Sequence, residues 1–284
     1  MSATIYKSKP SVVNKVFATG YYIAMTVLSV LFFYPMYWMI ISSFKSNRQI
    51  FSSPFSFPKK IDLNNWVQAW KVGKMSIYAL NSVITTSITV VVILIFAALA
   101  AFAFSKLEFR GSRLLLAMFV LGLFMPLQSY FIAQNYIFEY LNLKDTRLAL
   151  IIPYVAMGLP LAVFLLKAHN DSLPKELLES SRMDGATDFT IFSRVMLPLM
   201  MPGLSSVAIF SALNSWNEFL LALLYIQNEK LKTIPTGLLA FSSRYMTNYH
   251  LLFSALSIVT IPMIVVYVLF HRHIVSGLTE GSLK

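Results

Sequence analysis

Long apolar stretches without a charged side chain recur along this sequence. A bilayer core of about 30 Å needs about 20 apolar residues in helical form. Six stretches without Asp, Glu, Lys or Arg approach or exceed that length: Val16–Phe44, Met75–Ser105, Leu114–Phe138, Leu148–Leu166, Val195–Asn217 and Tyr245–His271. No alternating ten-residue pattern of a membrane β-barrel is present. The pattern therefore predicts an all-α integral membrane protein with six transmembrane helices.

The first apolar stretch has two interpretations, a cleaved signal peptide or a retained helix. Its apolar run is too long for a signal peptide, and no small-residue cleavage site precedes a polar mature region. We expect a retained helix, and we divide the chain into an N-terminal segment 1–15, a membrane domain 16–270 and a tail 271–284.

Composition supports the membrane class and excludes several chemistries. Hydrophobic residues make up 57% of the chain and charged residues only 12%, against about 25% charged in soluble domains. Without cysteine, the chain has no disulfide, thiolate metal site or cysteine nucleophile. The net charge is +11, but the basic residues of the chain lie between the apolar stretches and form no cluster of five. We expect them to contact membrane lipid headgroups and to bind no nucleic acid.

One polar connection, Lys167–Arg194, carries nine charged residues in 28. Its composition predicts a helix capped by Ser172, running over Pro174–Met183 and ended by Gly185. A second short helix is expected to start near Thr187. Helical spacing would gather an apolar face that needs a partner, made of Leu173, Leu177 and Leu178, with Ser181.

Sequence motifs for catalysis are missing. The chain has no Gly-x-x-x-x-Gly-Lys-Ser/Thr phosphate loop and no His-Glu-x-x-His pair,. The histidines have no ligand partners at metal spacing. They are His169, His250, His271 and His273. We predict a non-catalytic chain that binds no cofactor or metal of its own, which disfavours a membrane-embedded enzyme.

The polar connection resembles the EAA motif of binding-protein-dependent ABC transporter permeases. That motif reads Glu-Ala-Ala, three residues, Gly, nine residues, Ile, one residue and Leu-Pro. Here the same spacing is filled by Glu179-Ser180-Ser181, Gly185, Val195 and Leu197-Pro198, with Asp184 before the glycine. Ser-Ser for Ala-Ala and Val for Ile keep the side-chain sizes nearly constant.

Weaker motifs extend the resemblance over about residues 16–284. They are Asn81-Ser82, Ala103-Phe104-Ser105 with Gly111, Leu148–Tyr154, Trp216-Asn217-Glu218-Phe219 and Gly277–Gly281. Together they are similar to the carbohydrate-uptake branch, and to the smaller membrane subunit of maltose-type importers. The resemblance implies a type I ABC importer permease fold and import of a sugar or oligosaccharide.

The resemblance also implies an orientation and a set of partners. Residues 167–194 would be a cytoplasmic coupling loop that docks on a partner ATPase, which holds the ATP and Mg. The coupling residues would be Glu179, Ser180, Ser181, Asp184, Gly185, Leu197 and Pro198. Both termini would then be cytoplasmic, in a bacterial or archaeal plasma membrane. The positive-inside rule does not decide the orientation, because the two sides carry twelve and eleven basic residues,. Further partners would be a second permease subunit, two ATPase domains or subunits, and an extracytoplasmic binding protein.

Polar residues near or within the spans are candidates for the translocation path. They are Gln128, Gln134, Asn135, Asn214, Trp216, Asn217 and Glu218. Such residues either line a cavity or tie helices together, and both interpretations stay open. A polyol or glycerol-phosphate-like solute is an alternative cargo, although a phosphate favours Arg or Lys in a span and no span core has one. A half-sized secondary transporter acting as a dimer is another alternative, for which only Glu218 could carry ion coupling.

The first connection on the opposite side, Lys45–Lys74, is rich in aromatic residues. It contains Phe51, Phe55, Phe57, Trp66 and Trp70. Interfacial anchoring and docking of the binding protein both fit this composition. The resemblance places the later segment Glu218–His250 near the binding protein as well.

Overall fold

A computed structural model describes residues 12–126, 129–242 and 247–279, and this part of the chain is helical without a β-strand. In chain order the elements are α1 (Val12–Ser42), α2 (Asn47–Ser52), α3 (Asn64–Val72), α4 (Met75–Lys106), α5 (Ser112–Gly122), α6 (Phe131–Tyr140), α7 (Leu148–Ser172), α8 (Glu176–Met183), α9 (Asp188–Thr190), the π-helix η2 (Ile191–Met196), α10 (Leu197–Leu199), α11 (Met201–Asn217), α12 (Leu220–Tyr225), α13 (Ile234–Gly237), the 3₁₀ helix η3 (Leu238–Phe241) and α14 (Tyr249–Thr279). The predicted all-α class is confirmed.

Each predicted span contains at least one helix. Among the described residues, three helices are long and apolar enough to cross a membrane, within α1, α4 and α7. A fourth is counted if the pair Asp188–Leu199 and Met201–Asn217, bent by 73°, forms one span. The two remaining predicted spans coincide with the shorter apolar helices α5 and Tyr249–Val265.

The third predicted span is not one continuous helix. The predicted span Leu114–Phe138 is interrupted, because α5 ends at Gly122 and α6 begins only at Phe131. Pro126 lies in this break. It lacks the N–H that a helix needs and restricts the residue before it. Ser129 closes a turn there, with its backbone N–H and its hydroxyl both donating to the Pro126 carbonyl, at 3.0 and 2.7 Å.

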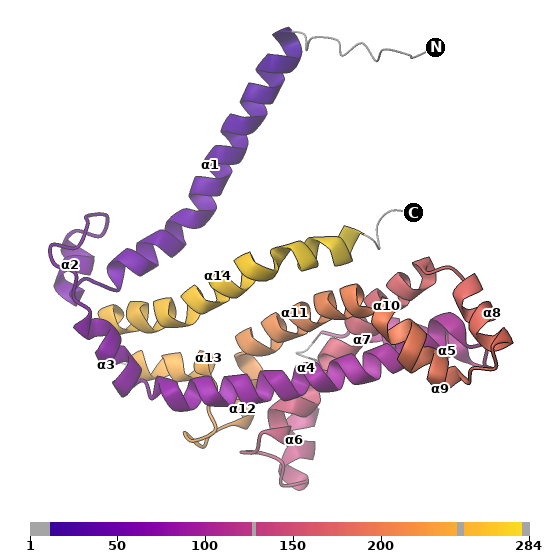
Figure 1. Cartoon of the computed structure of the whole chain (residues 1–284). Coiled ribbons are helices and arrows are strands. Elements are labelled where there is room, and N and C mark those ends of the chain that lie inside the picture. Colours follow the sequence, from indigo (N-terminus) through magenta and orange to yellow (C-terminus); the bar gives the residue numbers. More distant parts are fainter. Residues whose placement is uncertain (1–11, 127–128, 243–246, 280–284) are drawn as a thin grey trace.

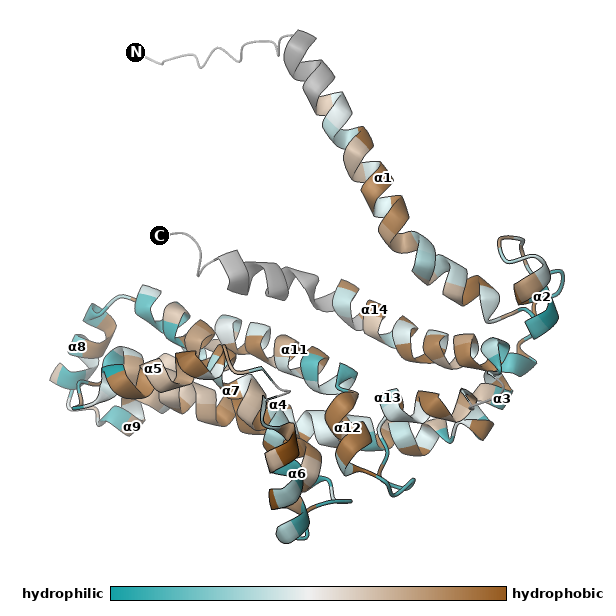
Figure 2. Cartoon of the chain, turned by 180° about the vertical axis from the view of Figure 1, so that it is seen from behind, coloured by the Kyte–Doolittle hydropathy of each residue, from teal (hydrophilic) through white to brown (hydrophobic). Residues whose placement is uncertain are grey.

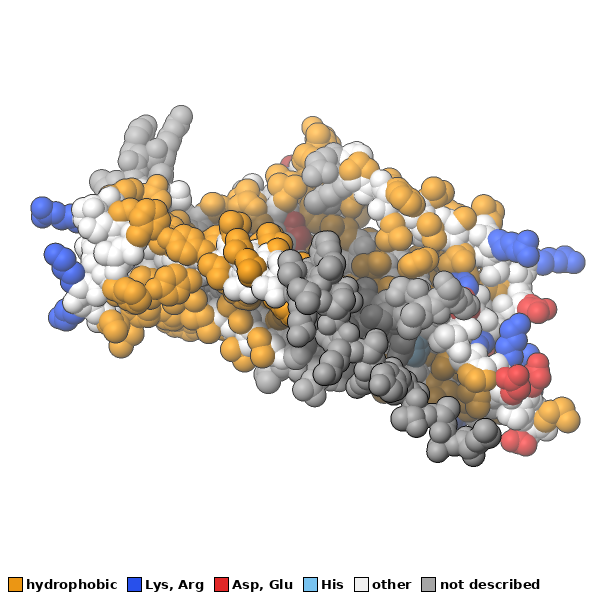
Figure 3. All heavy atoms as spheres, turned by 90° about the horizontal axis from the view of Figure 1, so that it is seen from above, with side chains coloured by type: hydrophobic (Ala, Val, Ile, Leu, Met, Phe, Trp, Pro, Cys, Tyr) orange, Lys and Arg blue, Asp and Glu red, His pale blue; other side chains and the backbone are white. Residues whose placement is uncertain are grey.

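The long helices run lengthwise, with the hairpin of α8 and α9 at one end of the molecule and α2 and α3 at the other (Figure 1). Hydrophilic residues gather at the α8–α9 end and around α2, and hydrophobic ones line the long helices between (Figure 2). The space-filling view likewise has Lys and Arg side chains at both ends and hydrophobic side chains between them (Figure 3). This distribution is that of a protein whose middle lies in hydrocarbon.

The main core joins α4, α7, η2 and α11. Small residues of α4 at its centre, Ala97, Ala98 and Ala101, are at most 3% exposed and pack beside Ala162 and Val163 of α7. Their size lets the two helix backbones approach closely. By contrast, α1 leaves the body of the protein (Figure 1), and none of its most apolar window is buried within this chain.

Candidate functional site

The hairpin that follows α7 has a turn defined by a glycine. Gly185 has a φ of +79°, and its N–H donates to the Arg182 carbonyl at 3.0 Å. The N–H of Ala186 donates to the Ser181 carbonyl at 3.1 Å, which completes a Schellman motif. The prediction that Gly185 ends this helix is confirmed. A Cβ atom at this position would meet no other atom within 4 Å, so backbone conformation and not lack of space requires glycine.

The second half of the hairpin also begins where the sequence predicts. The Thr187 hydroxyl oxygen accepts the N–H of Thr190 at 3.3 Å and caps α9,. An ion pair of 3.2 Å between Arg182 and Asp188 crosses the turn. The chain then continues through the π-helix η2, whose Ile191 is fully buried in the main core. Short π-helices occur frequently at functional sites.

The start of the hairpin differs from the prediction. Ser172 does not cap α8, because α7 continues to this residue and the Ser172 hydroxyl donates to the His169 carbonyl at 2.7 Å. An i,i+4 ion pair of 2.6 Å between Lys167 and Asp171 supports this extra turn of α7,. Helix α8 begins at Glu176 without a side-chain cap.

The predicted apolar face of the hairpin is divided in two. Leu173 and Leu178 pack against the main core and are half-buried. The large apolar side chains that stay exposed are Leu177, Met183 and Phe189, which are 37, 88 and 75% exposed. Of the predicted leucines only Leu177 stays exposed, and the exposed apolar surface of the hairpin also includes Met183 and Phe189.

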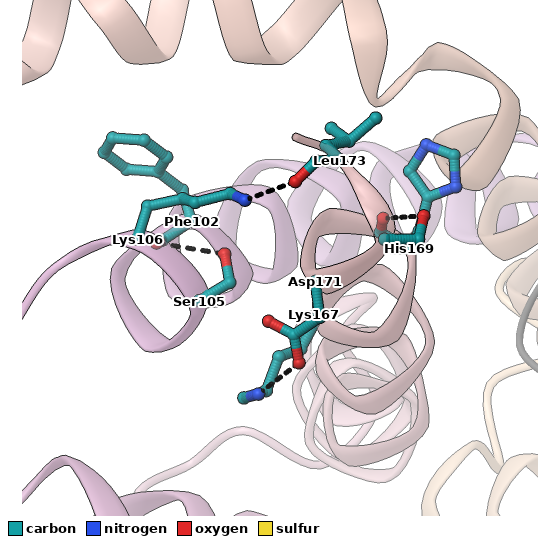
Figure 4. A network of polar contacts seen from close by, with 8 residues as sticks. Phe102, Ser105, Lys106, Lys167, His169, Asp171 and Leu173 are labelled. Carbon is teal, nitrogen blue, oxygen red and sulfur yellow. Dashed lines mark hydrogen bonds and ion pairs between the residues drawn. The ribbon is translucent and has the colours of Figure 1, made fainter. Parts of the chain in front are cut away.

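Hydrogen bonds tie both ends of the hairpin to the helices. The Lys106 ammonium at the end of α4 donates to the Leu173 carbonyl at 3.2 Å, and the two groups point toward each other in Figure 4. A His169 ring nitrogen lies 3.0 Å from the Leu199 carbonyl of α10. Since α10 leads through the 73° bend into α11, these contacts connect the hairpin to α4, α7 and α11.

A hollow of about 870 Å³ lies between the hairpin and the α4–α5 connection. Charged side chains of both signs line it, namely Lys106, Glu108, Lys175, Glu179, Arg182 and Asp188. Of the predicted coupling residues, five are exposed (Glu179, Ser180, Asp184, Gly185 and Pro198) and two are half-buried (Ser181 and Leu197). The Ser180 and Ser181 hydroxyls donate to the Leu177 carbonyl at 3.3 and 2.7 Å.

A second candidate site is a cavity of about 280 Å³ between α4, α7 and α11. It is lined by Ile93, Tyr154, Met157, Gly158, Ser211, Asn214, Ser215 and Glu218. Two predicted path residues, Asn214 and Glu218, thus meet at one cavity. A smaller adjoining cavity toward Leu165 shares Ser211 and Asn214, so α11 presents one polar face along both.

Glu218 lies at the break between α11 and α12. Its Oε2 atom accepts the Tyr154 hydroxyl at 2.7 Å and the N–H of Ala222 at 3.2 Å. Its Oε1 atom accepts the N–H of Leu221 at 2.8 Å. The carboxylate therefore caps α12 and ties it to α7, which is the helix-tying role that the sequence alone leaves open.

The other predicted path residues do not join this cavity. Trp216 lies on another face of α11 and packs against the core cluster around Met75 and Tyr78. Asn217 is exposed and donates to the Leu213 carbonyl at 2.8 Å. The remaining predicted residues are on or before α6: Gln134 accepts the Tyr225 hydroxyl at 3.0 Å, Asn135 is half-buried, and Gln128 lies outside the described residues.

The predicted path residues omit three polar side chains of this cavity, Tyr154, Ser211 and Ser215. The two serines fall at helical spacing with Asn214 and Glu218, since all four lie on one face at i, i+3, i+4 and i+7. That spacing was a usable signal. Tyr154 had no comparable signal, because it comes from another helix.

The Asn81-Ser82 motif has a structural role at the opposite end of the molecule. The Asn81 amide donates to the carbonyls of Lys230 and Lys232 at 2.8 and 3.1 Å, and its oxygen accepts from Arg147 at 3.1 Å. The Ser82 hydroxyl accepts the N–H of Ile234 at 2.9 Å. The pair holds the segment between α12 and α13 against α4.

An exposed ion pair between Lys74 and Glu229 fastens the same segment. The hydrogen bond and charge of Lys74 lower the pKa of Glu229 below its ordinary value, and Glu229 raises the pKa of Lys74 in return. The segment between α12 and α13 is therefore held by Asn81 and Ser82 of α4 and by the charge of Lys74, which precedes α4.

Known proteins are similar to this chain in sequence and in architecture. The family described as "Binding-protein-dependent transport system inner membrane component" matches residues 93–280, which is more than half of the chain. The chain belongs to this family. It is accordingly a multi-pass membrane protein and a permease component that works with other transporter subunits. The predicted resemblance to sugar-transport permeases of this kind is confirmed.

Individual relatives cover nearly the whole chain. It is 36% identical over 251 residues to the probable ABC transporter permease protein YurM of Bacillus subtilis, which covers 88% of this chain and 83% of that protein. It is 33% identical to the diacetylchitobiose uptake system permease protein NgcG of Streptomyces coelicolor, with coverage of 94 and 89%. It is 34% identical to the trehalose/maltose transport system permease protein MalG of Thermococcus litoralis, with coverage of 92 and 95%.

A solved structure has the same fold. The chain matches a bacterial ABC transporter involved in the import of the acidic polysaccharide alginate, with a TM-score of 0.80 and 20% sequence identity. The match covers 94% of this chain and 99% of that one.

Proposed function

We propose that this chain is a membrane subunit of an ATP-driven importer for a sugar or oligosaccharide. It would form half of the translocation path together with a second permease subunit. Two ATPase domains or subunits would hold ATP and Mg, and an extracytoplasmic binding protein would deliver the sugar. Relatives named for diacetylchitobiose and for trehalose and maltose support a carbohydrate. The chain itself carries out no catalysis in this proposal.

The main support is the mechanical connection between the hairpin and the polar cavity. The exposed side chains of Leu177, Met183 and Phe189 form a surface for the ATPase at one end of the molecule. From there the chain runs through η2 and the 73° bend into α11, whose polar face lines the cavity. Closure of the ATPase would push the hairpin and shift α11 against α7.

The lining of the cavity favours a neutral polyhydroxyl cargo. Hydroxyl and amide side chains such as Ser211 and Asn214 exchange hydrogen bonds with sugar hydroxyls. Among the described residues, no Lys or Arg lines the cavity of about 280 Å³, so its described lining offers no cation to pair with a phosphate. A polyol stays an alternative cargo.

The secondary-transporter alternative receives less support. Ion coupling within a membrane requires an ionisable group that gains and loses its partner. Glu218 already accepts three hydrogen bonds, from Tyr154, Leu221 and Ala222. In our proposal Glu218 is a fixed cap of α12. The proposed importer also has the hairpin and both termini in the cytoplasm.

Gentle purification of the tagged chain from its native host tests this function. We expect a P-loop ATPase and a second multi-span permease to co-purify in stoichiometric amounts. Deletion of the gene should also abolish uptake of one oligosaccharide. Recovery of the chain alone or only as a self-dimer, with proton- or sodium-dependent uptake, would contradict the importer and support the secondary transporter.

A further inference from the structure

The connection between α1 and α3 exposes three phenylalanines close to a membrane span. Phe51, Phe55 and Phe57 are 66, 79 and 71% exposed. Exposed rings gathered in a short segment mark a surface that contacts something apolar. Phe55 and Phe57 belong to a loop that follows α2, and their exposed rings need an apolar partner.

The backbone of this loop is turned inward. The Pro54 carbonyl accepts the Trp38 indole N–H at 2.9 Å and the Lys45 ammonium at 2.9 Å. The Gln49 side chain donates to the Phe57 carbonyl at 3.3 Å. Lys45 is only 1% exposed, so a buried cation holds the loop in place. These carbonyls are hydrogen-bonded within the protein, so they do not depend on water for a partner.

The loop folds back along α1 toward the hydrophobic part of the protein. The rings of Tyr37 and Phe57 meet edge to face with centroids 6.4 Å apart. Tyr37 lies five residues before the end of α1 at Ser42, or about 7.5 Å along the helix axis at 1.5 Å per residue. Phe57 therefore lies at the level of the last turns of the span and not beyond it.

The neighbouring charges fit anionic headgroups. Arg48, Lys59 and Lys60 are exposed around the rings, while the acidic residue that follows them, Asp62, accepts the N–H of Asn64 at 3.0 Å. Interfacial amphipathic helices bury their apolar face about 5–10 Å into the boundary between headgroups and acyl chains and carry basic residues on the polar face, and this segment has the same combination of exposed rings and cations.

From these observations we infer that the loop Phe51–Phe57 is an interfacial anchor. Phe55 and Phe57 insert into the outer boundary of the lipid bilayer, and Lys59 and Lys60 contact its phosphate groups. The anchor fixes the depth of the end of α1 and of the network around Lys45. Its placement on the outer side rests on the orientation in the proposed function, whereas insertion of the rings into the bilayer boundary rests neither on the transported solute nor on the ATPase.

Spin labelling tests the anchor directly, because the chain contains no cysteine. Phe55→Cys carries the nitroxide, and Lys60→Cys in the same loop is the matched control. The transporter is assembled with cysteine-free partner subunits in vesicles of phosphatidylethanolamine and phosphatidylglycerol. Collision of each label with oxygen, which enters lipid, is compared with collision of a water-soluble nickel complex.

The anchor predicts a several-fold higher ratio of oxygen to nickel collisions at Phe55 than at Lys60, without binding protein present. Equal ratios that change only when the binding protein is added would overturn the inference in favour of protein docking. Equal ratios under both conditions would overturn it as well, since the rings would then face water.

Discussion

The hydroxyl of Tyr154 on α7 donates a hydrogen bond to the Glu218 carboxylate at 2.7 Å. That carboxylate also accepts the backbone N–H groups of Leu221 and Ala222, at the start of α12. One side chain thus joins α7 to the break between α11 and α12, directly beside the polar cavity. A residue that could be taken for an ion-coupling site therefore acts as a fixed cap.

Substitutions at Glu218 separate these two roles. Glu218→Gln keeps one acceptor oxygen and should retain most uptake, because no proton has to be carried. Glu218→Ala removes the cap and should lower stability by about 1–2 kcal/mol, measured by thermal unfolding in detergent. Loss of uptake in Glu218→Gln with normal stability would instead indicate ion coupling.

The positive φ at Gly185 predicts that alanine and asparagine at this position lower the stability by different amounts. Gly185→Ala should cost about 1–2 kcal/mol, because L-residues avoid positive φ. Gly185→Asn should cost less, since asparagine adopts this conformation more readily and the surrounding space is open. Thermal unfolding and ATPase co-purification measure both. Equal effects of Ala and Asn would contradict the role of backbone conformation.

The hydrogen bond from Lys106 to the Leu173 carbonyl predicts that its removal uncouples ATP hydrolysis from sugar import. Lys106→Met removes the link between α4 and the hairpin, so ATP hydrolysis per sugar imported should rise in the reconstituted transporter. Lys106→Arg retains a donor and should restore most of the coupling. An unchanged ratio in Lys106→Met with a correctly assembled complex would show that this bond transmits nothing.

The ion pair of Lys74 and Glu229 predicts a pH-dependent attachment of the segment between α12 and α13. Because pairing lowers the pKa of Glu229, its contribution is present above the ordinary pKa of a glutamate and is lost as the pH falls through the lowered value. Hydrogen exchange of residues 227–233 should therefore accelerate in acid after correction for intrinsic rates. Glu229→Gln should exchange faster at neutral pH and lack this additional acid response.

The sequence predicts the long helices well and their interruptions poorly. Charges at Lys74 and Lys106 delimit α4 because a charged side chain is costly in hydrocarbon. The break after Gly122 is not evident from the sequence, since proline is tolerated in many membrane helices and only the structure shows that α5 ends at Gly122, before Pro126. The cap predicted at Ser172 is wrong because the ion pair of Lys167 and Asp171 extends α7.

For the candidate sites, helical periodicity explains both the success and the error. Gly185 is recognisable because a glycine after a polar helix ends it. Trp216 and Asn214 are two residues apart on α11, or about 200° around the helix at 3.6 residues per turn, so they could not share a cavity. Contacts from distant helices, such as that of Tyr154, leave no local pattern in the sequence.

The central claim is that the hairpin is the contact with a cytoplasmic ATPase, and site-directed cross-linking tests it most directly. Met183→Cys is compared with Tyr140→Cys, which is equally exposed on α6, at 86 against 88%. We predict that Met183→Cys cross-links to the ATPase and is shielded from an impermeant thiol reagent in intact cells. Labelling of Met183→Cys from outside the cell, without an ATPase cross-link, would contradict the account.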